Sequence, residues 1–209
     1  MRVSPSVPLL FCGIALLATG CKHDGDVIRI PGWVETKSSG VAISLPSELT
    51  VTDLSNGDLS EIKRRAKSQY PNQPELEKVV EKLAASGAMK LVAISAGQGS
   101  ASNQNSFSLV VQPVETSQTL ATLVEPNRVQ MNAVAVPGTL NVEMKQFPAG
   151  QSAYFQFDLA SGAAPHTQAT YILLRDSNEY VFTFSSSIAD KRIWGSVGES
   201  AMKSVHFDD

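Results

Sequence analysis

The sequence predicts an α+β domain in which helices cover a mainly antiparallel sheet. Its second half is dense in segments that alternate apolar and polar residues, as half-buried strands do. Short sequences rich in turn-forming residues separate these segments, and this favours hairpins and therefore antiparallel pairing. Two stretches with helical periodicity, at 74–86 and from about residue 189 onward, supply apolar faces that can cover such a sheet.

The first elements are short extended pieces, expected at 27–30 and 33–37. A clearer strand is predicted over 40–46, because Val41, Ile43 and Leu45 alternate with smaller or polar residues. Two helices should follow, the first over 61–69 after a cap at Asp58 or Ser60, and the second over 74–86. The second carries one apolar stripe, formed by Leu76, Val79, Val80 and Leu83.

The middle of the chain predicts a long-looped hairpin followed by a broken helix. Strands are expected at 89–96 and 107–113, and the turn-forming sequence between them should form a loop. Ser117 is the expected N-cap of a helix through Leu120 and Val124. Pro126 should interrupt this helix, since proline has no backbone N–H to donate, and a second segment should run from Asn127 towards Gly138.

Four strands are predicted in the second half, at 139–147, 151–159, 167–175 and 180–186. The sequence DSNE should form the tight turn between the last two. A final helix is expected from about Ala189, with Ile193, Val197 and Ala201 on its apolar stripe and Trp194 and Met202 beside them. The ending SVHF closes the chain.

Residues 1–20 have the pattern of a secretory signal peptide. The apolar run 7–18 is about a dozen residues long, which is shorter than the roughly 20 that a membrane-spanning helix needs. The residues Ala18-Thr19-Gly20-Cys21 resemble a bacterial lipobox, which implies cleavage between Gly20 and Cys21 and attachment of a lipid, with acyl chains such as palmitate, to the Cys21 thiol. The alternative is ordinary signal cleavage, which leaves that thiol unmodified.

Cysteine usage favours lipidation at Cys21. Cys12 lies inside the signal sequence and leaves with it, so Cys21 is the single cysteine of the exported chain and no internal disulfide can form. A lone thiol in an oxidising compartment is unusual unless it is used. Lys22 stands where an Asp would retain a lipoprotein at the inner membrane, so the outer membrane is favoured in an organism that has one. Residues 21–30 form a short tether, and 31–209 are expected to form a single domain near the lipid surface.

Charge argues against binding to nucleic acid. Without the signal sequence the chain keeps 16 basic and 20 acidic residues, a formal net charge of −4. The basic cluster at 63–67 fits the solvated side of a helix. A nucleic-acid-binding domain would need a basic face with interleaved aromatic residues, and the sequence shows neither.

No catalytic or metal-binding motif stands out, so we expect a non-enzymatic protein without a cofactor or metal. The sequence has no GxSxG nucleophile motif. Of its three histidines, His23 lies in the tether, His166 in a predicted turn and His206 at a predicted frayed end, and all three are expected to be solvated. The start Cys21-Lys22-His23 could hold copper or nickel through a free amine, two amides and the imidazole, but lipidation normally consumes that amine.

Three aromatic residues are candidates for partner contacts, because aromatic side chains dominate protein interfaces. Trp194 borders the stripe of the final helix, so it is expected in the core. Tyr154 alternates with apolar residues in a strand. Trp33 is the best surface candidate, and the alternative is that it simply covers the sheet.

The order of elements resembles the PsbP-like α/β/α sandwich. A strand that ends in SLP, a strand-rich centre, the paired strands of ATYILLRDSNEYVFTFSSS, a final helix and a short last strand carry this resemblance over residues 40–207. The fold includes the PsbP extrinsic subunit of photosystem II and the DcrB-like and LpqN-like lipoproteins. The resemblance implies a partner-binding or accessory role, and it assigns no functional residue to this chain.

Three functional hypotheses follow from these observations. The first is an envelope lipoprotein whose domain binds another envelope protein near the membrane. The second is a carrier of a small ligand or lipid, with a cleft between sheet and helices. The third is a hydrolase with a site that no motif reveals.

Overall fold

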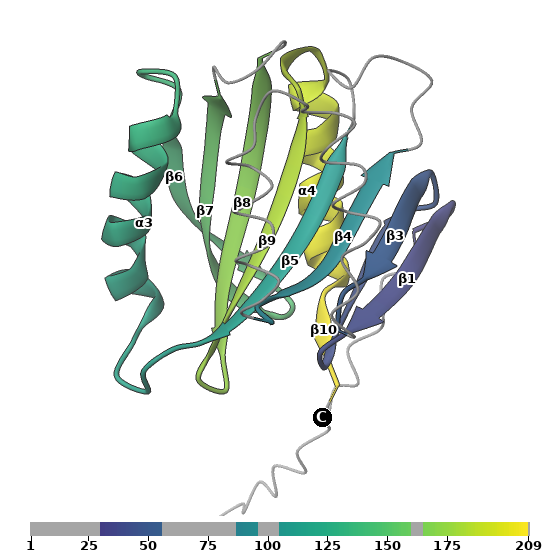
Figure 1. Ribbon diagram of the computed structural model, residues 1–209, viewed down its shortest axis with the longest axis horizontal. Helices are drawn as coiled ribbons and strands as arrows, with labels where there is room; N and C mark the ends of the chain where they lie inside the picture. Colours follow the sequence, from purple (N-terminus) through teal and green to yellow (C-terminus); the bar gives the residue numbers. More distant parts are fainter. Residues whose placement is uncertain (1–29, 56–86, 96–104, 160–164, 209) are drawn as a thin grey trace, which may run out of the picture.

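The computed structural model describes residues 30–55, 87–95, 105–159 and 165–208, and they form two antiparallel sheets with helices packed on them (Figure 1). The large sheet has the strand order β3-β4-β5-β9-β8-β7-β6, and the small sheet has the order β1-β2-β10. The strands of the first half are β1 (Trp33–Ser38), β2 (Val41–Pro46), β3 (Leu49–Asp53), β4 (Met89–Ser95) and β5 (Ser106–Pro113). Those of the second half are β6 (Asn141–Phe147), β7 (Gly150–Leu159), β8 (His166–Arg175), β9 (Asn178–Ser187) and β10 (His206–Phe207).

The predicted α+β class and antiparallel pairing are confirmed. β4 and β5 form the expected hairpin, and β6, β7, β8 and β9 pair consecutively. The turn between β8 and β9 places Asp176 and Ser177 at φ 50° and 58°, the left-handed conformation that a two-residue hairpin turn requires. The predicted helices at 61–69 and 74–86, most of the extended piece at 27–30 and most of the loop 97–106 lie outside the described residues.

The large sheet is covered on both faces. Helix α3 (Leu120–Val134) lies over β7 and β8 on one face, with Ala153, Phe155 and Ile172 beneath it. Helix α4 (Lys191–Ser204) and the small sheet cover the opposite face, where most of the core lies (Figure 1). Because both faces of the sheet are covered, β7 buries Tyr154 as well as its neighbours Ala153 and Phe155. Alternation alone would predict that one face of this strand is exposed to solvent.

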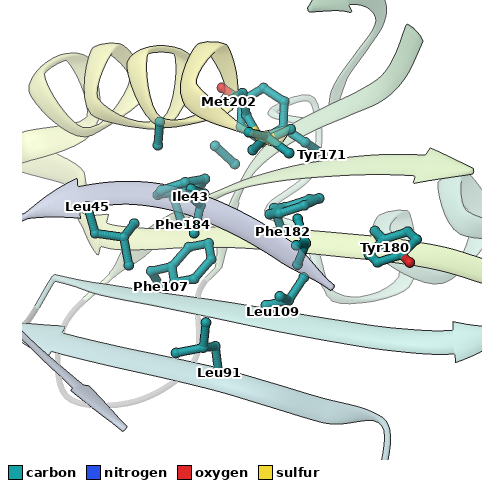
Figure 2. Close-up of a cluster of buried hydrophobic side chains, with 14 of the residues drawn as sticks. Ile43, Leu45, Leu91, Phe107, Leu109, Tyr171, Tyr180, Phe182, Phe184 and Met202 are labelled. Carbon is teal, nitrogen blue, oxygen red and sulfur yellow. The ribbon is translucent and has the colours of Figure 1, made fainter. Parts of the chain in front are cut away.

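The main core is rich in aromatic side chains (Figure 2). Phe184 of β9 lies 5.0 Å from the ring of Phe107 and 5.9 Å from that of Tyr171, in an edge-on arrangement with the latter. Ile43 and Leu45 from β2 join this cluster, as the strand prediction for 40–46 implies, because that alternation places them on one face. The core therefore ties the small sheet, α4 and the large sheet together.

Helix α4 is rotated relative to the predicted stripe. Trp194, Gly198, Ala201 and Met202 are buried, whereas Ile193 is 62% exposed, so its predicted place on the apolar stripe is wrong. The reason lies at Gly198, where the absence of a side chain lets the helix approach the sheet closely. A Cβ there would lie 3.2 Å from Tyr171 Oη and 3.3 Å from Phe184 Cδ2. The 3₁₀ turn η2 (Ile188–Asp190) leads into this helix.

Helix α3 also differs from its prediction. It is continuous through Pro126, and its N-cap is Thr119 instead of Ser117. Thr119 and Thr122 form a reciprocal capping box, in which each side-chain oxygen accepts a hydrogen bond from the other residue's backbone N–H. Pro126 is tolerated because α3 gains its stability from packing on the sheet rather than from an uninterrupted ladder of backbone hydrogen bonds.

Candidate functional site

An open groove of about 570 Å³ lies between α4 and the edge of the large sheet formed by β6 and β7. Its floor and sides come from segments that are far apart in the sequence. Its lining is Asn141, Glu143 and Lys145 from β6, Tyr154 and Gln156 from β7, Ile188 and Ala189 from η2, and Lys191, Arg192, Gly195, Ser196 and Glu199 from α4. Most of these side chains are polar or charged, so the groove suits a ligand that forms hydrogen bonds and ion pairs.

Lys145 is the centre of the charge network in this groove. Its ammonium group donates a hydrogen bond to Glu199 of α4, lies 3.9 Å from Glu143 Oε2, and stands 4.0 Å from the centroid of the Tyr154 ring. An ammonium group over an aromatic face gains about 0.5–2 kcal/mol. The contacts hold Lys145 on the α4 side of the sheet, and they link β6 to α4 across the groove.

The Tyr154 hydroxyl stays protonated over the physiological range. Burial, together with the nearby carboxylates of Glu199 and Glu143, raises the pKa of Tyr154 from 10.0 to about 12. A phenol that keeps its proton can donate a hydrogen bond but cannot act as a base near neutral pH.

We expect this raised pKa to make the protein less stable at high pH. An unfolded tyrosine ionises near pH 10.0 and Tyr154 in the folded state near pH 12, so the stabilisation is complete below pH 10.0 and is lost as the pH rises towards 12. NMR of the tyrosine ring carbons, compared between wild type and Tyr154→Phe, would identify the resonance that titrates near 12. A Tyr154 resonance that titrates near 10 would show that the ring is solvated.

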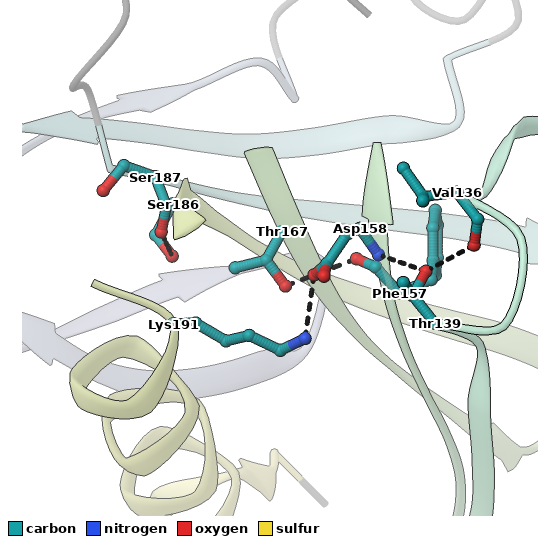
Figure 3. Close-up of polar contacts among 8 residues, drawn as sticks. All are labelled: Val136, Thr139, Phe157, Asp158, Thr167, Ser186, Ser187 and Lys191. Atoms are coloured by element: carbon teal, nitrogen blue, oxygen red, sulfur yellow. Dashed lines mark hydrogen bonds and ion pairs between the residues drawn. The ribbon is translucent and has the colours of Figure 1, made fainter. Parts of the chain in front are cut away.

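The beginning of α4 is fixed to the end of β7 by polar contacts (Figure 3). Lys191 Nζ lies 2.8 Å from Asp158 Oδ1, and the side chain of Asp158 is only 15% exposed. The backbone N–H of Asp158 donates to Thr139 Oγ1, and its carbonyl accepts from the Val136 N–H. Ser187 Oγ accepts from the Asp190 N–H and so caps η2. One end of the groove is therefore held in place from three elements.

Arg192 is the cation best placed to meet a partner. Its side chain is exposed at the rim of the groove, and its guanidinium group has no hydrogen-bond or ion-pair partner within the described part of the chain. Lys145 and Lys191, by contrast, are already paired with carboxylates. Arginine presents a planar set of donors that matches carboxylates well, so an acidic or strongly hydrogen-bonding group is the expected contact.

The two described histidines lie in strands, which corrects their predicted positions. His166 is the first residue of β8 and pairs with Ser187, and His206 lies in β10 opposite Ala42. Both are half-buried instead of fully solvated, because strand pairing draws the turn and the chain end onto the sheets. His23 lies outside the described residues.

His206 does not form a nucleophile–base pair with its nearest serine. Its Nδ1 lies 3.1 Å from the carbonyl oxygen of Ser204, and its Nε2 lies 3.9 Å from Glu35 Oε2. The Ser204 hydroxyl is buried, donates to the Ala201 carbonyl and accepts from the Ser44 N–H. A serine that is committed in this way is not available to attack a substrate.

The predicted aromatic contact residues have different environments. Trp194 is buried at 5% exposure, which confirms its place in the core, and Tyr154 forms part of the groove lining. Trp33 is half-buried and packs against the main core at the edge of the small sheet. The packing favours the alternative, in which Trp33 covers the sheet. Gly20 and Cys21 lie outside the described residues.

The described residues contain no group of three or more His, Cys, Asp or Glu side chains that could hold a metal ion. No helix in the same residues is long and apolar enough to cross a bilayer.

Most of the groove has no signature in the sequence. Four charged residues of the groove cannot be told from ordinary surface residues in the sequence: Glu143, Lys145, Arg192 and Glu199. Glu199 also lies 54 residues from Lys145 along the chain. Tyr154 was the only groove residue that the sequence singled out. The neighbours of Lys145, Met144 and Gln146, are exposed as well, so no local pattern in β6 points to Lys145.

Comparison with solved structures shows that the chain has the PsbP-like fold. It is similar to the solution structure of cyanobacterial PsbP (CyanoP) from Synechocystis sp. PCC 6803, with a TM-score of 0.53 and 8% identity over 86% of this chain and 95% of that chain. The order of strands and the final helix, predicted from the sequence over 40–207, is thereby confirmed as a PsbP-like arrangement.

Two further solved structures are similar. LpqN, involved in cell envelope biogenesis of Mycobacterium tuberculosis, has a TM-score of 0.44 and 4% identity over 57% of this chain and 72% of its own. PA94, a protein of unknown function from Pseudomonas aeruginosa, has a TM-score of 0.47 and 7% identity over 82% of this chain and 94% of its own. No family model matches the sequence. No curated protein matches it either.

Proposed function

We propose that this chain is an exported lipoprotein whose PsbP-like domain binds another envelope protein through the groove between α4 and β6–β7, without catalysing a reaction. The observation that carries this proposal is Arg192 at the rim of an open, polar groove, where its guanidinium group has no partner among the described residues. Lys145, Tyr154 and Glu199 line the same groove and contact one another through the Lys145 ammonium group. A partner that presents a carboxylate or several hydrogen-bonding groups would complete the unsatisfied side of this surface.

The lipobox supports attachment of the domain to a membrane. Lipidation of Cys21 would leave a tether of about ten residues, which reaches roughly 30 Å at most when fully extended. The groove would then lie within reach of other proteins at the same membrane surface. In an organism with two membranes, Lys22 favours the outer one.

The polar lining argues against the lipid-carrier alternative for this groove. A lipid chain needs an enclosed apolar cavity, because water must be excluded from its hydrocarbon surface. A small polar ligand remains the second candidate, since a volume of about 570 Å³ lies within the roughly 300–1,000 Å³ of small-molecule sites.

Crosslinking in native membranes tests the proposal. We expect one envelope protein to crosslink to the wild type, and the charge reversal Arg192→Glu to reduce its yield on the order of tenfold by replacing attraction with repulsion at the rim. Lys203→Glu is the matched control, because Lys203 is exposed on the same helix but does not line the groove. Cys21→Ser should lack acyl chains by intact mass and leave the membrane fraction.

Each contrary result has a clear meaning. An unmodified mass for mature wild type would contradict the lipoprotein assignment. An equal yield from Arg192→Glu and Lys203→Glu would exclude the groove as the binding surface. A small molecule that copurifies with wild type and is lost from Arg192→Glu would support the polar-ligand alternative.

A further inference from the structure

Strand β6 is an open edge of the large sheet. It pairs with β7 on one side, and no described strand pairs with its other side. Asn141, Glu143, Met144 and Gln146 are exposed along it, with Met144 46% exposed. An open edge offers a row of backbone N–H and C=O groups to another strand.

Two common protections of an edge strand, a proline and a β-bulge, are absent from β6. Its sequence NVEMKQF contains no proline, and its register with β7 runs from Asn141 to Phe147 without a bulge. Its charged residues, Glu143 and Lys145, lie on the face of the sheet that α4 covers, where Lys145 is 22% exposed and contacts Glu199 and the Tyr154 ring. The edge can therefore accept an additional strand.

The side chains of β6 are complementary to a second copy of β6. In an antiparallel pair about a two-fold axis at Met144, all seven residues are paired, and Glu143 of each copy lies opposite Lys145 of the other. Opposite charges that face each other across strands stabilise a pair, and like charges destabilise it. The exposed Met144 side chains would cover each other on the α3 side of the sheet, where their apolar surface leaves water.

Neighbouring registers are unfavourable. A two-fold axis perpendicular to the sheet keeps each side chain on its own face of the sheet. Residues opposite each other must therefore lie on the same face, so the axis can move only by whole residues along β6. The first step in one direction places Glu143 opposite Glu143 of the second copy, and the first step in the other places Lys145 opposite Lys145. The charges and the strand length thus select the same register.

We propose that two copies of this chain associate through antiparallel pairing of their β6 strands, which joins the two large sheets into one continuous sheet. Because α4 keeps to one face, the two grooves would then lie side by side across the two-fold axis. The second copy is the partner that this edge fits, since the pairing requires only the charge pattern of β6 itself.

The edge strand β1 provides a matched comparison. Its Glu35 and Lys37 have the same spacing as Glu143 and Lys145. However, a self-complementary register of β1 that faces Glu35 with Lys37 leaves Trp33 unpaired, whereas that of β6 uses the whole strand.

Charge-swap variants test the proposal in the full-length protein, with native mass spectrometry from mild detergent. Wild type should be a dimer. Glu143→Lys and Lys145→Glu should each raise the dimer dissociation constant on the order of tenfold or more, since two opposite-charge pairs become two like-charge pairs. An equal mixture of the two variants should form a heterodimer with wild-type affinity, because each lysine then meets a glutamate again. Glu35→Lys and Lys37→Glu should leave the dimer unchanged.

The mixture separates a loss of pairing from a loss of folding, because two misfolded variants cannot restore an interface by mixing. A monomeric wild type, single variants that dimerise like wild type, or a mixture that stays monomeric would each overturn the proposal. A dimer that responds to the β1 variants instead would also overturn it. None of these results depends on Arg192, so the outcome is separate from that of the groove test.

Discussion

Replacing Phe184 by alanine should remove about 3–5 kcal/mol from the free energy of unfolding, the range for a fully buried aromatic residue. Phe184 is 2% exposed, and its ring contacts those of Phe107 and Tyr171 beneath Gly198 of α4. The cavity would lie between the large sheet and α4, where neither side can close without disturbing the other. Because small domains are stable by only about 5–15 kcal/mol, much of the variant should be unfolded at modest denaturant concentrations.

Urea unfolding, followed by circular dichroism, measures this loss. Ile193→Ala on α4 is the control, because Ile193 is 62% exposed and its truncation should change the stability by no more than about 0.5 kcal/mol. If the two variants lost the same amount, the described packing of α4 over Phe184 would be wrong.

The strands were predictable because their signal is local. In β7 and β9 the alternation, the bounding turns and the aromatic content all point to the same structure, and the two-residue turn at Asp176 and Ser177 follows from its own sequence. Such signals need no knowledge of the rest of the fold. The antiparallel class followed from them because hairpins set the pairing of neighbouring strands.

The helices were less predictable because tertiary contacts decide their details. Pro126 breaks an isolated helix, yet α3 continues through it where the sheet supports it. The rotation of α4 depends on Gly198, whose small size matters only because Tyr171 and Phe184 lie opposite it. The sequence places Ile193 on the longest apolar stripe, but a close approach at one glycine outweighs that preference.

The groove could not be predicted from the sequence because it also depends on tertiary contacts. Its central contacts join Lys145 of β6 to Glu199 of α4, and no periodic pattern relates two residues that far apart. The charge complementarity of β6 is visible in the sequence NVEMKQF, but its meaning depends on the knowledge that β6 is an edge strand. The sequence therefore specified the strand framework, while the surfaces available to partners required the structure.

Alanine at Gly198 should destabilise the protein, whereas alanine at Gly195, one turn earlier on the same helix, should stabilise it. Both changes raise the helix propensity by about 1 kcal/mol. At Gly195 the added Cβ meets no atom within 4 Å, so the gain is kept. At Gly198 it would lie 3.2 Å from Tyr171 Oη and 3.3 Å from Phe184 Cδ2, and forcing additional atoms into a packed core costs about 1–3 kcal/mol.

The difference between the two variants isolates the close approach of α4, since helix propensity cancels between them. Tyr171 Oη has no hydrogen-bond partner among the described residues, so Tyr171→Phe removes a buried polar atom and the shortest of the contacts with a Cβ at residue 198. The double variant Tyr171→Phe/Gly198→Ala should therefore recover part of the stability that Gly198→Ala loses, as measured by the midpoint of urea unfolding. Equal stabilisation by alanine at both positions would show that α4 lies further from the sheet than described, and the groove floor that depends on this helix would then be wider as well.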